Sequence, residues 1–271
     1  MKAALAVAAL LLATTGPQPA ELRLDGQPVQ GGVLRGIVPP GTVSLALDGR
    51  AVPLAPDGRF LIGFDRDAAP VARLELRRAD GTTEARTLSV APGQWRIERV
   101  NLARPAGGPT EAFRRLREAE RARIDAARAE AVDSDGWRQR FVWPAQGRIS
   151  GRFGSQRIYR GGVPGAYHSG LDIAPGAGAT VVAPADGVVT LAPPPMFSLE
   201  GNLVIVNHGM GLSSAFLHLS RATVRVGERV RQGQPIGAVG ATGRATGPHL
   251  HWSVTWNDAR VDPERLLGSA P

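Results

Sequence analysis

The segment Pro248-His249-Leu250-His251-Trp252 is the most informative stretch of this sequence. Side chains alternate between the two faces of a β-strand, so His249 and His251 are expected on one face and Leu250 on the other, towards a core. Paired histidines of this kind can bind a metal ion, but they are also common among ordinary strand residues. The segment therefore predicts a strand with two imidazoles on one face, which needs further ligands from elsewhere in the chain.

A second segment, His168-Ser169-Gly170-Leu171-Asp172, offers an imidazole and a carboxylate four positions apart. Two histidines and one aspartate are a sufficient ligand set for Zn²⁺ with one coordination position left for water. Such a site lowers the pKa of the bound water to roughly 7. Neither segment alone is specific for a metal site. The chain has only 5 histidines, however, so the presence of both segments favours such a site.

All of these histidines lie in residues 141–268, a Gly-rich region that we expect to form the functional domain. Runs of β-branched and apolar residues at 180–183, 187–191 and 202–206 are typical of strands. Turn-rich spacers separate them. We expect a largely antiparallel sheet that carries a groove.

Residues 21–104 are expected to form a separate small β-sandwich-like accessory domain. Segments 43–47 and 71–76 alternate at period two, as half-buried strands do. Four turn signals punctuate the region: Asp25-Gly26, Asp48-Gly49, Asp57-Gly58 and Asp80-Gly81. It contains no histidine, so we expect a binding or spacing role.

Residues 105–140 are predicted to be a linker followed by a charged helix. Thr110 is a plausible N-cap, and the helix is expected to run to about Val132. Its apolar stripe is thin, and no heptad repeat is sustained. A solvated connecting helix is therefore favoured over a partner-binding coiled coil.

Residues 1–20 match a secretory signal peptide, with Lys2 followed by an apolar run and small residues. Cleavage is expected after Ala20, with Gly16 as an alternative site. The run is too short for a permanent span, although an uncleaved anchor stays an alternative. No other stretch approaches eighteen apolar residues, so no transmembrane anchor is expected after cleavage.

The composition of the chain excludes several classes of protein and of binding partner. The 271 residues include no cysteine, which excludes a disulfide scaffold, a thiolate zinc cluster and a cysteine nucleophile. The net charge is +8, but the arginines are spread over all parts without interleaved aromatics. Nucleic acid is therefore not an expected partner. A polyanionic wall polymer or an anionic membrane surface suits the charge better.

Residues 144–267 contain a series of short motifs in a fixed order: Arg152-Phe153-Gly154, 168–172, 183–189, Asn207-His208-Gly209, 216–220, 230–234 and 242–252. In order and spacing these motifs resemble the lysostaphin-like, LytM-type zinc metalloendopeptidase family of bacterial cell walls. That family is peptidoglycan DD-endopeptidase-like and has the duplicated hybrid motif fold.

The resemblance implies a role for each histidine of the domain. His168, Asp172 and His251 would bind one Zn²⁺ ion. His218 and His249 would be catalytic, one as the general base and the other as the group that stabilises the oxyanion, in either order. His208 would lie outside the ligand set, where it supports the site or the fold.

The implied function is that of a secreted zinc metalloendopeptidase that hydrolyses peptide bonds in peptidoglycan cross-links or stem peptides. The periplasm is favoured over the extracellular space, and other cell wall proteins are admitted as partners. The alternative is a catalytically silent LytM-type protein that binds and activates another cell wall hydrolase. Retention of all three ligand residues favours the enzyme.

Overall fold

The computed structural model describes residues 21–105 and 107–268. The predicted signal peptide, residues 1–20, lies outside the described residues. No helix in the described part of the chain combines the length and apolarity needed to cross a membrane.

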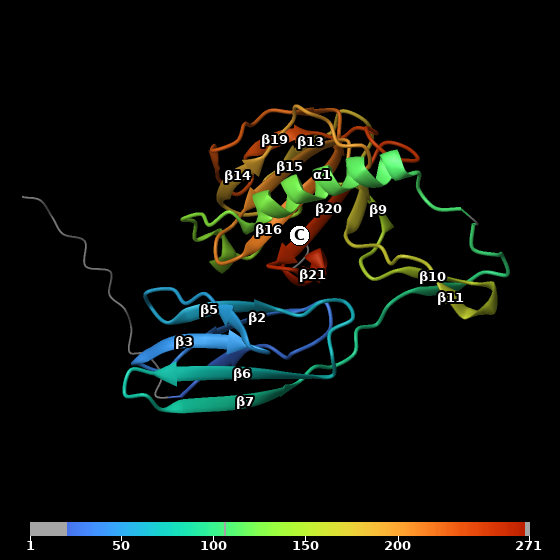
Figure 1. Ribbon diagram of the computed structural model, residues 1–271. Helices are drawn as coiled ribbons and strands as arrows, with labels where there is room; N and C mark the ends of the chain where they lie inside the picture. Colours follow the sequence, from blue (N-terminus) through green and yellow to red (C-terminus); the bar gives the residue numbers. More distant parts are fainter. Residues whose placement is uncertain (1–20, 106, 269–271) are drawn as a thin grey trace, which may run out of the picture.

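The N-terminal part consists of two antiparallel sheets (Figure 1). One has the order β1 (Arg23–Asp25), β2 (Val33–Ile37), β5 (Arg59–Gly63), and the other β4 (Arg50–Val52), β3 (Thr42–Leu47), β6 (Val71–Arg78), β7 (Thr83–Ser89). Alternate residues such as Leu45 and Leu74 are buried together with Phe60 of the other sheet. The period-two pattern at 43–47 and 71–76 thus corresponds to β3 and β6.

The β3–β4 hairpin turns at one of the predicted Asp-Gly pairs. Asp48 and Gly49 have φ of 49° and 78°, and Leu47 pairs with Arg50 across the turn. A two-residue hairpin turn of this type needs positive φ at both positions, which Asp-Gly tolerates. The turn thereby sets the register of β3 against β4.

The C-terminal part is built on a large antiparallel sheet, as the sequence predicted. Its path is β18 (Arg229–Val230), β14 (Gly187–Leu191), β15 (Asn202–Asn207), β16 (Leu212–Leu219), β20 (Leu250–Trp256), β12 (Leu171–Ala174), β9 (Arg148–Gly151), with β21 (Ala259–Val261) on β20. A second sheet has the order β13 (Thr180–Val182), β19 (Pro235–Ala238), β17 (Arg221–Ala222). Short 3-10 turns cover Gly136–Arg138, Arg160–Gly162 and Pro263–Arg265.

A small sheet joins the two parts of the chain. β8 (Ile97–Arg99) runs parallel to β10 (Gln156–Tyr159), which in turn pairs with β11 (Val163–Pro164). In Figure 1, β10 and β11 project to one side of the large sheet. Residues 97–99, which the sequence assigned to the accessory domain, therefore pair with a strand of the C-terminal part.

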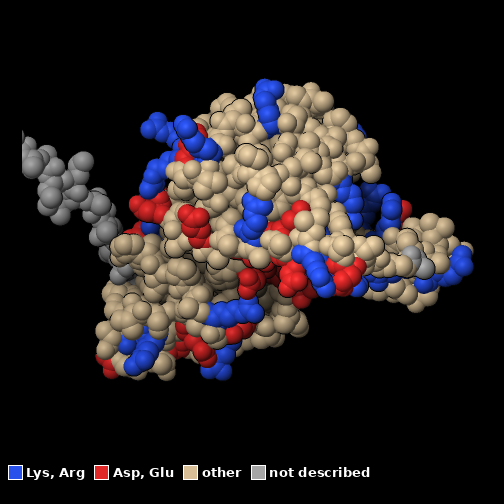
Figure 2. Space-filling view, turned by 45° about the horizontal axis from the view of Figure 1, so that its top comes forward, with Lys and Arg blue, Asp and Glu red and all other residues tan. Residues whose placement is uncertain are grey.

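Charged side chains also connect the two parts. Arg138 donates to Asp57 at 2.8 Å, and Arg35 donates to the carbonyl oxygen of Trp137 at 3.0 Å. Figure 2 shows basic and acidic side chains intermixed along this boundary. Trp137 is buried at this boundary, so the contact between the two parts of the chain is apolar as well as ionic.

Helix α1 (Glu111–Ala129) begins as predicted, since the Thr110 hydroxyl accepts a hydrogen bond from the Phe113 N–H at 3.2 Å. It ends at Ala129, earlier than expected. The expectation of a solvated helix was wrong, because Ile124 and Ala127 are buried against the large sheet. Figure 1 shows α1 lying across that sheet. The thin apolar stripe is enough to hold α1 on the sheet because buried ion pairs also attach the helix there.

Those ion pairs centre on Arg117, whose side chain is 9% exposed. Its guanidinium donates two hydrogen bonds to Glu200, at 2.7 and 2.8 Å, and also contacts Glu120. Arg117→Met would leave the buried carboxylate of Glu120 and the half-buried carboxylate of Glu200 without their cation. The expected loss in the free energy of unfolding is about 3 kcal/mol, measured by urea denaturation.

The matched control is Arg115→Met on the same helix. Arg115 pairs with Glu111, but its side chain is 78% exposed. Solvent screens such a pair, so the expected loss is below about 0.5 kcal/mol. Equal losses in the two variants would contradict the proposed attachment of α1.

Candidate metal centre

Three predicted ligand residues meet on adjacent strands of the large sheet. Asp172 in β12 lies directly opposite His251 in β20, and His168 precedes β12. Asp172 Oδ1 lies 3.1 Å from His168 Nε2 and 2.8 Å from His251 Nδ1. The two imidazole nitrogens are 3.1 Å apart. Antiparallel pairing of β12 and β20 thus brings together side chains 79 residues apart.

The donor set fits a single zinc ion. Tetrahedral zinc with bonds of about 2.0–2.1 Å separates its ligand atoms by roughly 3.3 Å, close to the spacings found here. Two glycines leave room for the donors. A Cβ on Gly151 would lie 2.5 Å from Asp172 Oδ2, and one on Gly170 would lie 2.6 Å from His251 Nε2. Among the described residues, no other group of three such side chains comes together in this way.

The protonation states of two of the three residues suit metal binding. Burial alone would raise the pKa of Asp172, but hydrogen bonds from His168 and His251 hold it well below its usual range. Burial lowers the pKa of His251. For His168, burial is outweighed by the hydrogen bond and charge of Asp172, which raise its pKa. An ionised Asp172 and a neutral His251 are the forms that bind zinc.

His218 and His249 lie next to this cluster with their free nitrogens available. The Nδ1–H of His218 donates to the carbonyl oxygen of Thr242, and that of His249 to Gly247, both at 2.8 Å. A carbonyl only accepts, so Nδ1 carries the proton and each Nε2 keeps its lone pair. His249 Nε2 lies 3.8 Å from Asp172 Oδ1, and the His218 and His249 ring centres are 4.9 Å apart.

His218 adopts an uncommon backbone conformation, with φ of 64°. Left-handed non-glycine residues of this kind often occur at functional sites. Its N–H donates to the carbonyl oxygen of Glu200 at 2.8 Å. Burial lowers the pKa of His218, which favours the neutral, proton-accepting form.

His208 lies outside the cluster, in the core. Its Nδ1–H donates to the carbonyl oxygen of Asp186, and its Nε2 accepts from the Ser214 hydroxyl, both at 2.8 Å. The Phe141 ring packs edge-on against it at 4.8 Å. Burial lowers the pKa of His208 to about 4, so it is neutral at pH 7.

This shift predicts a dependence of stability on pH. Because the folded pKa of His208 lies below the ordinary value, only the unfolded chain takes up this proton as the pH falls below 6.5. The contribution of neutral His208 to the free energy of unfolding is complete above pH 6.5 and is lost towards pH 4. Wild type is expected to lose about 2 kcal/mol through this group between about pH 7 and 4.5.

His208→Gln carries no titrating group at this position, so it should lose about 2 kcal/mol less than wild type over the same range. Urea unfolding of both proteins at the two pH values measures the difference. Identical pH dependence in the two proteins would contradict a neutral, buried His208.

The candidate metal centre opens to the surface. A cavity of about 250 Å³ contains both Asp172 and His249. Its other lining residues are Arg148, Ser150, Ala174, Thr246, Gly247 and Pro248. No sequence motif pointed to Arg148 and Ser150, which lie at the site because β9 pairs with β12.

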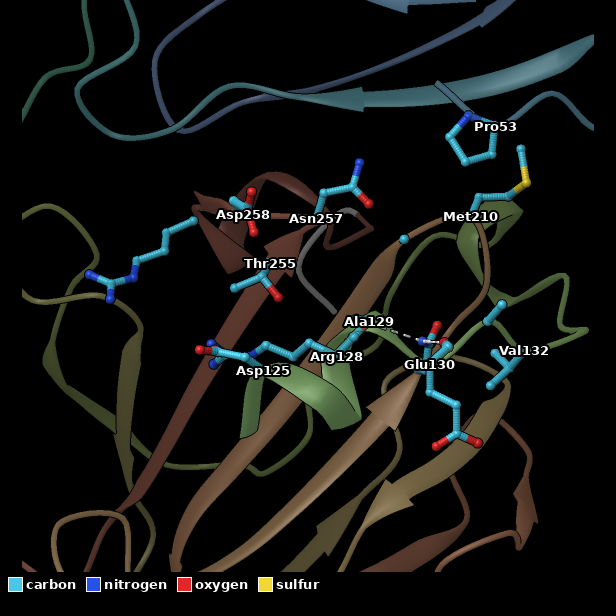
Figure 3. Close-up of a pocket in the computed structure, with 14 residues that line it drawn as sticks. Pro53, Asp125, Arg128, Ala129, Glu130, Val132, Met210, Thr255, Asn257 and Asp258 are labelled. Carbon is cyan, nitrogen blue, oxygen red and sulfur yellow. Dashed lines mark hydrogen bonds between the residues drawn. The ribbon is translucent and has the colours of Figure 1, made fainter. Parts of the chain in front are cut away.

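A larger cavity of about 650 Å³ lies elsewhere, between the end of α1, the turn after β20 and Pro53 (Figure 3). It is lined by charges of both signs, including Arg128, Glu130 and Asp258, and by no histidine. Asn207, another lining residue, donates a hydrogen bond to the Glu130 carbonyl oxygen at 2.6 Å. The larger of the two cavities is therefore not the one at the candidate metal centre.

Comparisons with known proteins agree with this geometry. The sequence model of peptidase family M23 matches residues 166–263. A solved structure from Pseudomonas aeruginosa that is assigned to peptidase M23 is 32% identical and superposes with a TM-score of 0.68. The match covers 90% of this chain and 96% of that one. The chain therefore belongs to peptidase family M23, which confirms the LytM-type resemblance.

Curated relatives match over the C-terminal part. Peptidoglycan DD-endopeptidase ShyC of Vibrio cholerae is 38% identical over 119 residues, which are 44% of this chain and 27% of the relative. Cell division protein DipM of Caulobacter vibrioides is 33% identical over 147 residues, 54% of this chain and 23% of the relative. The chain thus spans about a quarter of the length of the curated relatives that it matches.

Proposed function

We propose that this chain is an exported zinc metalloendopeptidase that hydrolyses peptide bonds in peptidoglycan cross-links or stem peptides. The observation that carries the proposal is one open site with three metal donors, His168, Asp172 and His251, beside two imidazoles with free lone pairs. Membership of peptidase family M23 and the DD-endopeptidase relatives support the substrate class.

Zinc held by these three residues would supply a Lewis acid and would make water more acidic. The chain's own contribution is proton transfer. We assign the general base to His249, because its Nε2 lies 3.8 Å from the ligand oxygen of Asp172, next to the donor set. It accepts a proton from the attacking water and returns it to the leaving amine as the peptide C–N bond breaks. His218, whose neutral form is favoured in the free protein, would take up a proton from solvent as negative charge develops on the carbonyl oxygen, and its Nε2–H would then stabilise the oxyanion.

The remaining features support a role at the cell wall. The predicted signal at 1–20 would direct export, with the periplasm favoured. The net charge of +8 suits a polyanionic polymer as substrate. Peptidoglycan is the proposed partner, together with other cell wall proteins.

The test is a digest of purified peptidoglycan with zinc-loaded residues 21–271, followed by mass spectrometry of the products, with His249→Ala in parallel. New amine and carboxyl ends at one peptide bond, absent with the variant, are expected. A folded, zinc-loaded wild type that releases no fragments would contradict the proposal and favour the silent activator.

A further inference from the structure

The first candidate ligand, His168, depends on a neighbouring segment for its position. Its Nδ1–H donates to the carbonyl oxygen of Arg152 at 3.1 Å, which leaves Nε2 for the metal. Its backbone N–H donates to the carbonyl oxygen of Ser155, and its own carbonyl accepts from the Gly154 N–H, both at 2.8 Å. His168 lies before β12 rather than within it, so these three bonds hold it in place.

His168 is also the most exposed of the three. Its side chain is 24% exposed, against 20% for Asp172 and 12% for His251. His168 also lies outside the strand ladder that holds Asp172 and His251. Its position therefore depends on its hydrogen bonds to segment 152–155.

The N-terminal part reaches that segment through Arg66, whose side chain is 9% exposed. Arg66 Nη2 donates to the carbonyl oxygen of Gly154 at 3.1 Å and to Gln156 Oε1 at 3.0 Å. Its guanidinium also lies 5.0 Å from the ring centre of Tyr167, the residue before His168. One buried cation thus contacts both chain segments that define the position of His168.

Trp95 supports the same segment from another side. A Cβ on Gly154 would lie 2.2 Å from the indole, and one on Gly31 would lie 2.8 Å from it. Phe153 packs edge-on against the indole with ring centres 5.5 Å apart. Gly154 itself has φ of 77°, a conformation that favours glycine. The indole therefore fills a space that both parts of the chain leave for it.

We propose that Arg66 and Trp95 are positioning residues for His168, so that the N-terminal β part sets the zinc affinity of the C-terminal part. The inference rests on the proposed zinc site. Groups that orient metal ligands change metal affinity by about 10- to 100-fold when removed. A ligand that is not held in place must be ordered by the metal, which weakens binding.

The test compares Arg66→Met with wild type in the full chain, residues 21–271. The zinc dissociation constant is measured by competition with a chromophoric chelator, and is expected to rise about 10-fold. The visible absorption of the Co²⁺-substituted protein should change as well, because one ligand is less well oriented. Arg73→Met, which removes a 64% exposed arginine from β6, is the control and should leave both readouts unchanged.

The melting temperature of the zinc-free proteins separates folding from metal binding. If Arg66→Met does not fold, Trp95→Phe takes its place and should weaken zinc binding several-fold. A folded variant that binds zinc as tightly as wild type, with the same Co²⁺ spectrum, would overturn the inference. If wild type itself binds no stoichiometric zinc, the proposed function fails first and the inference fails with it.

Discussion

His249→Ala is expected to bind one zinc ion per chain while peptidoglycan hydrolysis falls by about 10²- to 10⁴-fold. The reason is geometric. His249 Nε2 lies 3.8 Å from Asp172 Oδ1, close to the donor set, but it does not belong to the group of three ligand atoms. Removal of its imidazole takes away the proposed proton acceptor and leaves the donors in place.

Two measurements on the same preparation check this result. Metal analysis after dialysis gives the zinc stoichiometry, and initial rates of muropeptide release give the activity. The control is His208→Gln, which alters a histidine in the core and should keep most of the activity at pH 7 if the variant is folded. Loss of zinc from His249→Ala would show that His249 is a ligand, contrary to the assignment.

His251→Ala is expected to lose both zinc and activity. His251 lies directly opposite Asp172 in the paired strands, and its Nδ1 lies 2.8 Å from the ligand oxygen. Two donors would remain, which cannot form a three-ligand site. We expect zinc binding to weaken by at least about 100-fold and hydrolysis to fall to background at micromolar zinc.

The metal content of His251→Ala is compared with that of His249→Ala, since the two variants differ by two positions in one segment. Circular dichroism of the zinc-free proteins shows whether both are folded. A folded His251→Ala that retains stoichiometric zinc would contradict the proposed ligand set.

The residues of the candidate metal centre could be proposed from the sequence because they lie in short, local motifs. The alternation at 249–251 is present in the structure, where Leu250 is fully buried and His251 reaches Asp172. Period-two patterns likewise located β3 and β6, and Thr110 located the start of α1. Each of these features depends on spacing within a few residues, which a sequence displays directly.

The features that the sequence did not reveal depend on contacts between distant segments. The buried pair of Arg117 and Glu200 joins residues 83 positions apart, so α1 could not be placed on the sheet from its own pattern. Arg66 contacts Gly154 across 88 positions. Neither arginine differs in local pattern from the exposed arginines around it. Only the fold shows which charges are buried.

The most direct test of the proposed zinc site is a crystal structure of the zinc-loaded protein with anomalous data at the zinc edge. One strong peak is expected about 2 Å from His168 Nε2, a carboxylate oxygen of Asp172 and His251 Nδ1, with His218 and His249 beyond bonding distance. A peak bonded to His218 or His249, or no peak among these three residues, would contradict it.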